Sequence, residues 1–201
     1  MVMRIEIATE SADSLPQYGR VPLAFESRSV LDVEPRSSDG GGFILTERAL
    51  AAPTVKDYDA IAGNRPSDWP ARFDVTNWGF LAASLAGRRV GGAAIVFRSP
   101  AIDMLEGRDD LAVLWDIRVA PAARGQGIGS ALLAATERWV RERGGRWLKV
   151  ETQNINVPAC RFYARHGFVL ESANASAYPE FPQEVQLLWY KELSRVAGDT
   201  P

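Results

Sequence analysis

One stretch, residues 111–143, constrains the fold of this 201-residue chain more than any other. Its first nine residues, LAVLWDIRV, are mostly apolar β-formers, and Pro121 cannot continue a hydrogen-bonded ladder, which predicts a buried strand. From Ile128 onward apolar residues recur at helical spacing, and Gly144-Gly145 supplies a stop signal. The stretch therefore predicts a strand, a glycine-rich turn and an amphipathic helix.

The turn itself, RGQGIGS over residues 124–130, is suited to binding an anion. Its alternate glycines remove side chains where the backbone must approach another group closely. The helix that follows directs its first N–H groups and its positive dipole end to the same place, so a phosphate or pyrophosphate would bind there. A P-loop would need a lysine at the start of the helix, and residues 127–130 contain none. A dinucleotide-binding fold would need the pattern G-x-G-x-x-G, which this loop does not match, although Glu151 lies near the position of the acidic residue in that pattern. A purely structural turn also remains open.

The turn also resembles the acetyl-CoA loop of the GNAT N-acetyltransferase superfamily, Arg/Gln-x-x-Gly-x-Gly/Ala, through Arg124, Gly127 and Gly129. A second stretch, NVPACRFYARHGF over residues 156–168, resembles the later motif of the same superfamily, N-x-x-A-x-x-(apolar)-Y-x-x-x-G-F. The motifs occur in the right order with a predicted strand between them. The resemblance implies an α/β (α+β) fold with a mixed, mostly antiparallel central sheet, helices on both faces, and a splay between the two central strands.

Composition is consistent with one soluble domain. A hydrophobic content of 46% is enough for a core, and a net charge of −2 gives no basic footprint for nucleic acid. The single cysteine, Cys160, excludes an internal disulfide framework, fits a reducing cytosol and is expected to be buried. No apolar run approaches the roughly 20 residues of a membrane span, and residues 1–10 are no signal peptide. We therefore expect a cytoplasmic protein with no nucleic-acid or membrane partner, and a homodimer stays open.

The remaining elements follow from periodicity and turn residues. Residues 4–8 and 21–26 are candidate strands, residues 37–42 are a flexible link, and residues 43–72 are expected to hold one or two short helices broken at prolines. Further predicted strands are 78–85 and 90–97 (a hairpin), 147–152, 168–172 and 184–190, with a helix at 157–166. The predicted organisation is an N-terminal extension over residues 1–42, an acetyltransferase domain over 43–195 and a disordered tail over 196–201.

The resemblance implies how acetyl-CoA binds. Backbone N–H groups of the 124–130 loop would hold the pyrophosphate, with added charge from Arg124, and the end of the 111–119 strand would bond to the pantetheine arm. The N–H of Val119 would bond to the thioester carbonyl. Asn156 is a good helix N-cap from its residue type and would also contact the cofactor. The predicted cofactor-binding residues are Ile117, Arg118, Val119, Arg124, Gly125, Gln126, Gly127, Ile128, Gly129, Ser130, Asn156, Ala159 and Phe162; no metal is expected.

Acetyl transfer to an amine also needs an acid and a base. Tyr163 occupies the tyrosine position of the second motif and is the candidate acid for the departing thiolate; the alternative is a core aromatic residue. Asp116 and Glu151 are the candidate bases or substrate-amine ligands, or else ion-pair partners of neighbouring cations. Strand alternation puts Asp116 and Arg118 on the face opposite Trp115 unless a bulge intervenes.

Within the superfamily, the streptothricin acetyltransferases look closest. The similar segments are Trp115-Asp116-Ile117, Glu151-Thr152-Gln153, residues 159–163 and residues 184–190. The resemblance implies transfer to an amine of a small cationic molecule in a ternary complex. The predicted substrate-binding residues are Trp115, Asp116, Glu151, Tyr178 and Glu184. The alternatives are a protein N-terminal acetyltransferase and a non-catalytic acyl-CoA-binding module.

Overall fold

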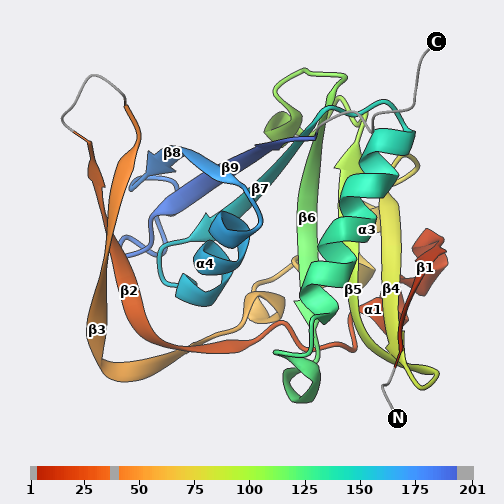
Figure 1. The fold of residues 1–201 in the computed structure, drawn as a ribbon, viewed down its shortest axis with the longest axis horizontal. Helices are drawn as coiled ribbons and strands as arrows, with labels where there is room; N and C mark the ends of the chain where they lie inside the picture. Colours follow the sequence, from red (N-terminus) through yellow and green to blue (C-terminus); the bar gives the residue numbers. More distant parts are fainter. Residues whose placement is uncertain (1–3, 37–40, 194–201) are drawn as a thin grey trace. The chain divides into compact units, whose positions relative to one another are not determined.

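The computed structural model describes residues 4–36 and 41–193, which form two compact units. Of these residues, the first unit comprises 4–24, 57–148 and 192–193, and the second comprises 25–36, 41–56 and 149–191. Both units contain strands and helices that are labelled in chain order in Figure 1.

The first unit is built on four strands that are adjacent in the order β1, β4, β5, β6, with every pair antiparallel. Their bounds are β1 Ile5–Glu10, β4 Gly79–Leu85, β5 Arg88–Phe97 and β6 Leu111–Val119. Helix α3 (Ile128–Glu142) packs across β4, β5 and β6 (Figure 1). A Cβ atom at Gly79 would lie 2.6 Å from Cε2 of Trp139, so glycine lets the helix approach the sheet closely.

Short helices and aromatic side chains occupy the other face of these strands. Tyr18, Trp69, Trp78 and Phe80 belong to one buried cluster, and ring centroids of neighbouring aromatics lie about 6 Å apart. Burial of each large ring contributes roughly 1.5–3 kcal/mol. The helices of this unit, besides α3, are η1 Ala12–Ser14, α1 Leu15–Tyr18, η2 Tyr58–Ala60, η3 Pro66–Asp68, α2 Trp69–Arg72, η4 Asp103–Leu105 and η5 Pro121–Ala123.

Strand β6 contains a bulge. Ile95 of β5 pairs with Leu114 and the next pair is Ala94 with Asp116, so Trp115 has no partner across the ladder. A bulge inserts one extra residue and changes which face the following side chains occupy. This irregularity sets the orientation of the residues discussed below.

The second unit contains β7 (Trp147–Gln153), β9 (Gln186–Glu192) and β8 (Val169–Asn174), adjacent in that order, with helix α4 (Val157–Arg165). The thiol of Cys160 on α4 is buried, as predicted, 3.3 Å from the hydroxyl of Thr152. That hydroxyl accepts a hydrogen bond of 2.8 Å from the indole of Trp189. Burial raises the pKa of Cys160 to about 11, which fits a packing role.

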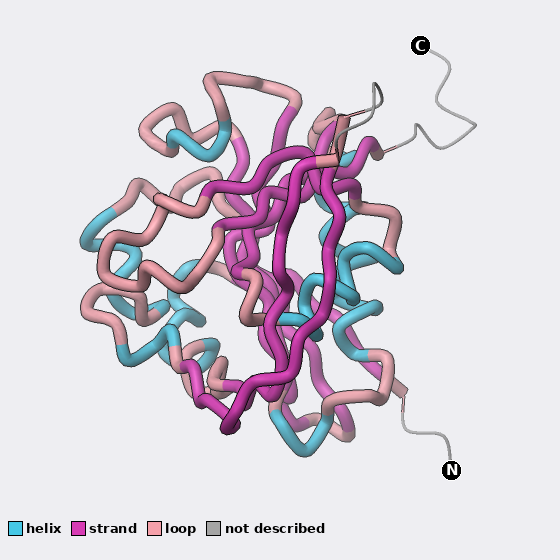
Figure 2. Tube along the Cα trace, turned by 90° about the vertical axis from the view of Figure 1, so that its left-hand side faces the viewer, coloured by secondary structure: helices cyan, strands magenta, loops and turns pink. Residues whose placement is uncertain are grey.

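The expectation of helix at the start of residues 43–72 is wrong. Residues 43–56 form a strand, β3 (Phe43–Lys56), which pairs antiparallel with β2 (Phe25–Pro35) in a long hairpin (Figure 2). Ser27 pairs with Thr54 and Ser29 with Ala49, so Pro53 falls in the irregular segment between these pairs. A proline at an irregularity removes no ladder hydrogen bond, so it does not break the strand.

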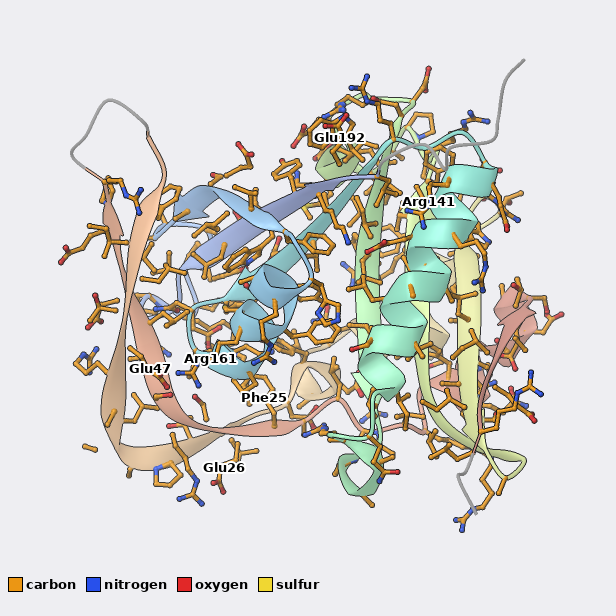
Figure 3. All side chains as sticks on the ribbon, in the orientation of Figure 1. Phe25, Glu26, Glu47, Arg141, Arg161 and Glu192 are labelled. Carbon is orange, nitrogen blue, oxygen red and sulfur yellow. The ribbon has the colours of Figure 1, made fainter. Side chains whose placement is uncertain are left out.

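The hairpin is tied to the rest of the second unit through Asn154. The backbone of Leu31 exchanges two hydrogen bonds of 3.0 Å with Asn154, whose side-chain oxygen also accepts from Val185 N–H at 2.8 Å. Glu47 on β3 forms an ion pair with Arg161 on α4 (Figure 3). The predicted domain boundary at residues 42 and 43 lies within this hairpin; the domain limits as a whole stay a prediction.

The other predicted elements agree with the structure to within two residues, except for the strand predicted over residues 21–26. Strand β2 begins at Phe25 and continues to Pro35, nine residues beyond the predicted end. Val21 instead is buried beside α1, where its N–H bonds to Tyr18 O at 3.1 Å. The short helices expected before residue 72 are present as η2, η3 and α2. Most of the predicted link and the whole predicted tail, residues 37–40 and 196–201, lie outside the described residues.

Candidate active site

The loop between β6 and α3 is open and glycine-dependent. Gly125 and Gly127 have φ angles of 77° and 81°, a left-handed conformation that other residues rarely adopt. Gly127 is the N-cap of α3, and a Cβ atom at either glycine would meet no other atom within 4 Å. The N–H groups of the first helical turn have no acceptor within the helix. The loop therefore fits a bound diphosphate, because backbone donors and open space coincide there.

Two side chains hold this loop to neighbouring backbone. The Arg124 guanidinium donates to the carbonyl oxygens of Val119 at 3.1 Å and Ala24 at 3.0 Å. The amide of Gln126 donates to Ala122 O at 3.2 Å. Arg124 therefore fixes the loop against the end of β6 and keeps a positive charge beside it.

The bulge in β6 brings Trp115 to the same face of the strand as Asp116 and Arg118. Regular strand alternation would have placed Trp115 on the opposite face. Trp115 is half-buried, with ring centroids 5.3 Å from both Phe73 and Trp78. Asp116 accepts hydrogen bonds from Tyr18 Oη at 2.5 Å and from Arg118 at 2.6 and 2.9 Å. Both oxygens of this carboxylate are occupied.

Arg118 is the centre of a buried charged cluster. Its side chain has no exposed area, and its other contacts are Asp59 at 3.0 and 3.2 Å and Val21 O at 3.1 Å. Burial lowers the pKa of Arg118, but hydrogen bonding and charge from Asp116 raise it above its ordinary value. Two carboxylates and one guanidinium leave this cluster with a net negative charge. Sequence reasoning missed Asp59, because no motif connects it to Arg118.

Glu151 on β7 has a different environment. One carboxylate oxygen, Oε1, accepts from Tyr178 Oη at 2.5 Å, and the other, Oε2, accepts from Gln186 Nε2 at 2.8 Å. Gln153 Nε2 donates to Tyr178 Oη at 2.8 Å and to Glu151 Oε1 at 3.4 Å. The structure thus brings together two predicted substrate-binding residues, Glu151 and Tyr178. Gln153 lies two residues after Glu151, and strand alternation puts both side chains on one face, so this spacing could have identified Gln153 from the sequence. No such spacing connects Gln186 with Glu151.

Glu184 is occupied by an ion pair. Its carboxylate lies 2.6 Å from Lys56 Nζ, and both side chains are almost fully buried, at 4% and 11% exposed. The Lys56 ammonium also lies 3.5 Å from the ring centroid of Phe181. A substrate-binding role for Glu184 stays a prediction, and in this structure its charge is paired.

Helix α4 presents the residues of the second motif. The Asn156 side chain accepts from Ala159 N–H at 3.3 Å, which confirms its N-cap position. Tyr163 is 4% exposed and packs edge-on against Phe162 and Phe168. His166 lies at the end of the helix with Nδ1 2.7 Å from Phe162 O, a position typical of a residue that interacts with the helix dipole.

Comparison with known proteins identifies the family. Residues 50–168 match the model of the acetyltransferase (GNAT) family. The chain belongs to the GNAT family. It is 30% identical to the streptothricin acetyltransferase of Streptomyces lavendulae over 155 residues, which cover 77% of this chain and 76% of that protein. It is 40% identical to streptothricin acetyltransferase A of Bacillus subtilis over 81 residues, 39% of this chain and 47% of that protein.

A solved structure supports the GNAT fold. The crystal structure of a Bacillus anthracis protein described as a streptothricin acetyltransferase, in complex with acetyl coenzyme A, aligns with a TM-score of 0.74. It is 21% identical and covers 94% of this chain and 99% of that one. The predicted α+β fold with mostly antiparallel strands is confirmed. The splay between the central strands stays a prediction.

As a GNAT family member the chain is an acetyltransferase that uses acetyl-CoA. The open loop before α3 fits the diphosphate of that cofactor, whereas the roles of individual site residues stay predictions. Within residues 4–36 and 41–193, no group of three or more His, Cys, Asp or Glu side chains could hold a metal ion. In the same described residues, no helix combines the length and apolarity needed to cross a membrane.

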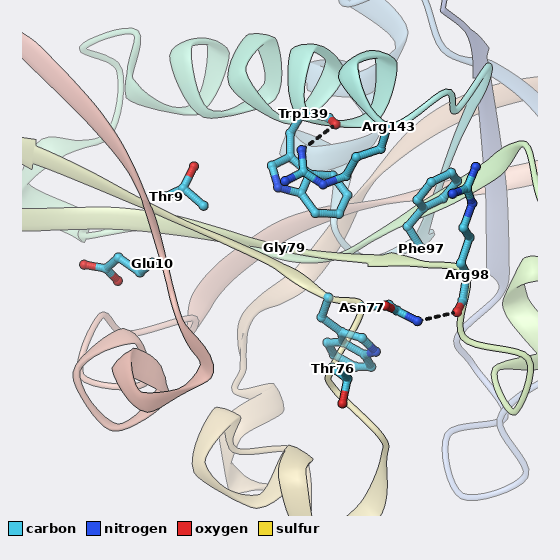
Figure 4. Close-up of a pocket in the computed structure, with 10 residues that line it drawn as sticks. Thr9, Glu10, Thr76, Asn77, Gly79, Phe97, Arg98, Trp139 and Arg143 are labelled. Carbon is cyan, nitrogen blue, oxygen red and sulfur yellow. Dashed lines mark hydrogen bonds between the residues drawn. The ribbon is translucent and has the colours of Figure 1, made fainter.

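This GNAT protein has a separate cavity of about 270 Å³ near the C-terminal end of α3 (Figure 4). The Arg143 guanidinium lies 4.0 Å from the ring centroid of Trp139 and donates to its carbonyl oxygen at 3.2 Å. Asn77 donates to Arg98 O at 3.0 Å on another wall. The glycine loop is at the opposite end of the 15-residue helix, so this cavity is distinct from that loop.

Proposed function

We propose that the chain transfers the acetyl group of acetyl-CoA directly to a primary amine of a small cationic molecule of the streptothricin type, in a ternary complex. Two curated relatives named streptothricin acetyltransferases support this acceptor class. The observation that carries the proposal is the carboxylate of Glu151. It is half-buried and accepts hydrogen bonds from neutral side chains, and among the described residues no cation pairs with it. Its charge is therefore available to a cationic acceptor.

Acetyl-CoA supplies an activated thioester, and the chain's own residues position it. The backbone of residues 124–130 and the positive end of α3 hold the diphosphate, with Arg124 fixing the loop. The end of β6, from Ile117 to Val119, orients the pantetheine arm through its backbone. The N–H of Val119 donates to the thioester carbonyl, a contact of the kind that contributes about 3–4 kcal/mol in acyl transfer.

Proton movements complete the proposed reaction. A carboxylate, Asp116 or Glu151, takes the proton of the acceptor ammonium, directly or through a water. Tyr163 gives its phenolic proton to the departing thiolate as the C–S bond breaks, and the tyrosinate takes the second proton of the nitrogen once the C–N bond has formed. Replacement of Tyr163 by Phe is then expected to lower turnover about 100-fold, with the Kd of acetyl-CoA unchanged. Steady-state kinetics together with calorimetric titration of acetyl-CoA measure both quantities; unchanged turnover would remove Tyr163 as the acid.

The experiment that tests the function measures free thiol released from acetyl-CoA on addition of an acceptor panel. The panel contains streptothricin, spermidine and a peptide with a free N-terminus. Release with streptothricin or spermidine supports a small cationic acceptor. Release with the peptide alone would indicate protein N-terminal acetylation, and acetyl-CoA binding without release from any acceptor would indicate a binding module.

We also propose that the chain acts in the cytoplasm, in line with its single, buried cysteine. Fractionation of expressing cells tests this location. The homodimer that the sequence leaves open can be tested separately by light scattering of the purified chain.

A further inference from the structure

Asp116 and Glu151, which the sequence leaves as equal candidates for the base or substrate-amine ligand, differ in the groups that bond to their carboxylates. Both oxygens of Asp116 are bonded within a buried cluster that contains the guanidinium of Arg118. Glu151 is bonded by neutral groups and is half-buried. A carboxylate whose charge is already paired gains less from a cationic acceptor than one whose charge is unpaired. The acceptor is therefore expected to bind at Glu151.

We propose that Gln186 is a positioning residue for the acceptor: together with Tyr178, it holds the Glu151 carboxylate in the orientation that receives the acceptor's ammonium group. This inference rests on the proposed function. Residues 184–190 resemble the streptothricin acetyltransferases, but that resemblance assigns no role to Gln186.

The contacts fix the carboxylate from both sides. Gln186 Nε2 donates to Oε2 at 2.8 Å and Tyr178 Oη donates to Oε1 at 2.5 Å. Gln153 Nε2 also donates to Oε1, at 3.4 Å. Bonds to both oxygens restrain rotation about the last side-chain torsion of Glu151, which is otherwise broad. Gln186 is the first residue of β9, the strand next to β7, so its backbone is held by the sheet. Gln153, 2.8 Å from Tyr178 Oη, holds the phenol in turn.

The chemistry of Gln186 suits this role. An ionised carboxylate offers about four acceptor positions, so the three bonds from Tyr178, Gln153 and Gln186 leave one position for an ammonium group. A lysine or arginine at position 186 would neutralise Glu151, and an acidic residue would repel it. A neutral amide orients the carboxylate without adding a charge of its own. Gln186 therefore supports cation binding where a charged residue would oppose it.

Kinetics of purified full-length variants with streptothricin as the acceptor test the proposal. Gln186→Leu removes the donor at similar volume and is expected to raise the KM for streptothricin about tenfold, with the KM for acetyl-CoA unchanged. Gln186→Glu places a second carboxylate beside Glu151, and like charges this close cannot both ionise easily. The acid limb of its kcat/KM profile is expected to move upward by about one pH unit, which a purely structural role would not produce. Gln183→Leu is the matched control, because Gln183 is exposed and forms no hydrogen bond among the described residues.

Each outcome is decisive. Both shifts, with Gln183→Leu like wild type, support the proposal. Wild-type kinetics and pH profile in both Gln186 variants would overturn it while leaving the function intact. If the wild-type chain releases no thiol with streptothricin or spermidine, the proposed function fails and the inference fails with it. Thermal unfolding of each variant checks folding, and the near-isosteric Gln186→Glu keeps the test valid if the leucine variant does not fold.

Discussion

Two acidic residues on strands of the two units, Asp116 on β6 and Glu151 on β7, look alike in the sequence and differ in the structure. Asp116 is held by a fully buried arginine and by Tyr18. Glu151 is held at a half-buried position by a tyrosine and a glutamine. The difference supports our proposal that the first carboxylate stabilises its unit and the second binds the cationic acceptor. The environment, more than the residue type, separates these two roles.

The largest expected effect comes from Arg118→Met, which leaves Asp116 and Asp59 without their cation. Removal of one partner from a buried ion pair typically costs about 3–5 kcal/mol, because the remaining charge is uncompensated. Urea unfolding monitored by tryptophan fluorescence measures the loss in free energy of unfolding. A loss below about 1 kcal/mol would mean that both carboxylates reach solvent, and the contrast with Glu151 would not hold.

Glu151→Gln, in contrast to Arg118→Met, is expected to lower activity with little change in stability. The value of kcat/KM for streptothricin should fall about 100-fold, equivalent to roughly 2.7 kcal/mol, while the free energy of unfolding changes by less than about 1 kcal/mol. Asp116→Asn should show the reverse, with stability changing more than activity. If Asp116→Asn impaired catalysis more than Glu151→Gln did, the assignment of roles to the two carboxylates would be exchanged.

Tyr18→Phe tests the hydrogen bond to Asp116 and should lower the free energy of unfolding by about 2 kcal/mol at neutral pH. Burial, followed by the negative charge of Asp116, raises the pKa of Tyr18 well above 10.0. Above pH 10 the unfolded chain loses the phenolic proton while the folded chain keeps it, so wild-type stability should decline as pH rises. Unfolding curves from pH 8 to 11 should show the difference between wild type and variant shrinking; a constant difference would contradict this.

The smallest effect is expected for Arg138→Met, the control for Arg118→Met. Arg138 Nε lies 4.0 Å from Glu142 on α3, and both side chains are more than 60% exposed. An exposed pair of this kind contributes about 0.5 kcal/mol or less. The same urea experiment should give a change within that range. A larger loss would mean that charge at α3 contributes to stability through a contact beyond this pair.

Local pattern alone was sufficient for much of the fold and for part of the site. The apolar spacing of residues 111–143 predicted β6, the loop and α3, and Asn156 predicted the start of α4. These features depend on residues a few positions apart, where backbone geometry determines which side chains share a face. The β2–β3 hairpin was missed at β3 because Pro53 read as a helix break, whereas pairing with β2 accommodates it at an irregularity.

Pairings between distant residues were decided by the tertiary structure alone. Arg118 meets Asp59 and Tyr18, Glu184 meets Lys56, and Gln186 meets Glu151, each across a separation that no local periodicity spans. The bulge at Trp115 likewise depends on the partner strand β5. Sequence therefore determined the family motifs and the glycine-rich loop before α3. Only the folded chain decided which carboxylate is paired with a cation, because ion pairing depends on spatial neighbours and not on neighbours in sequence.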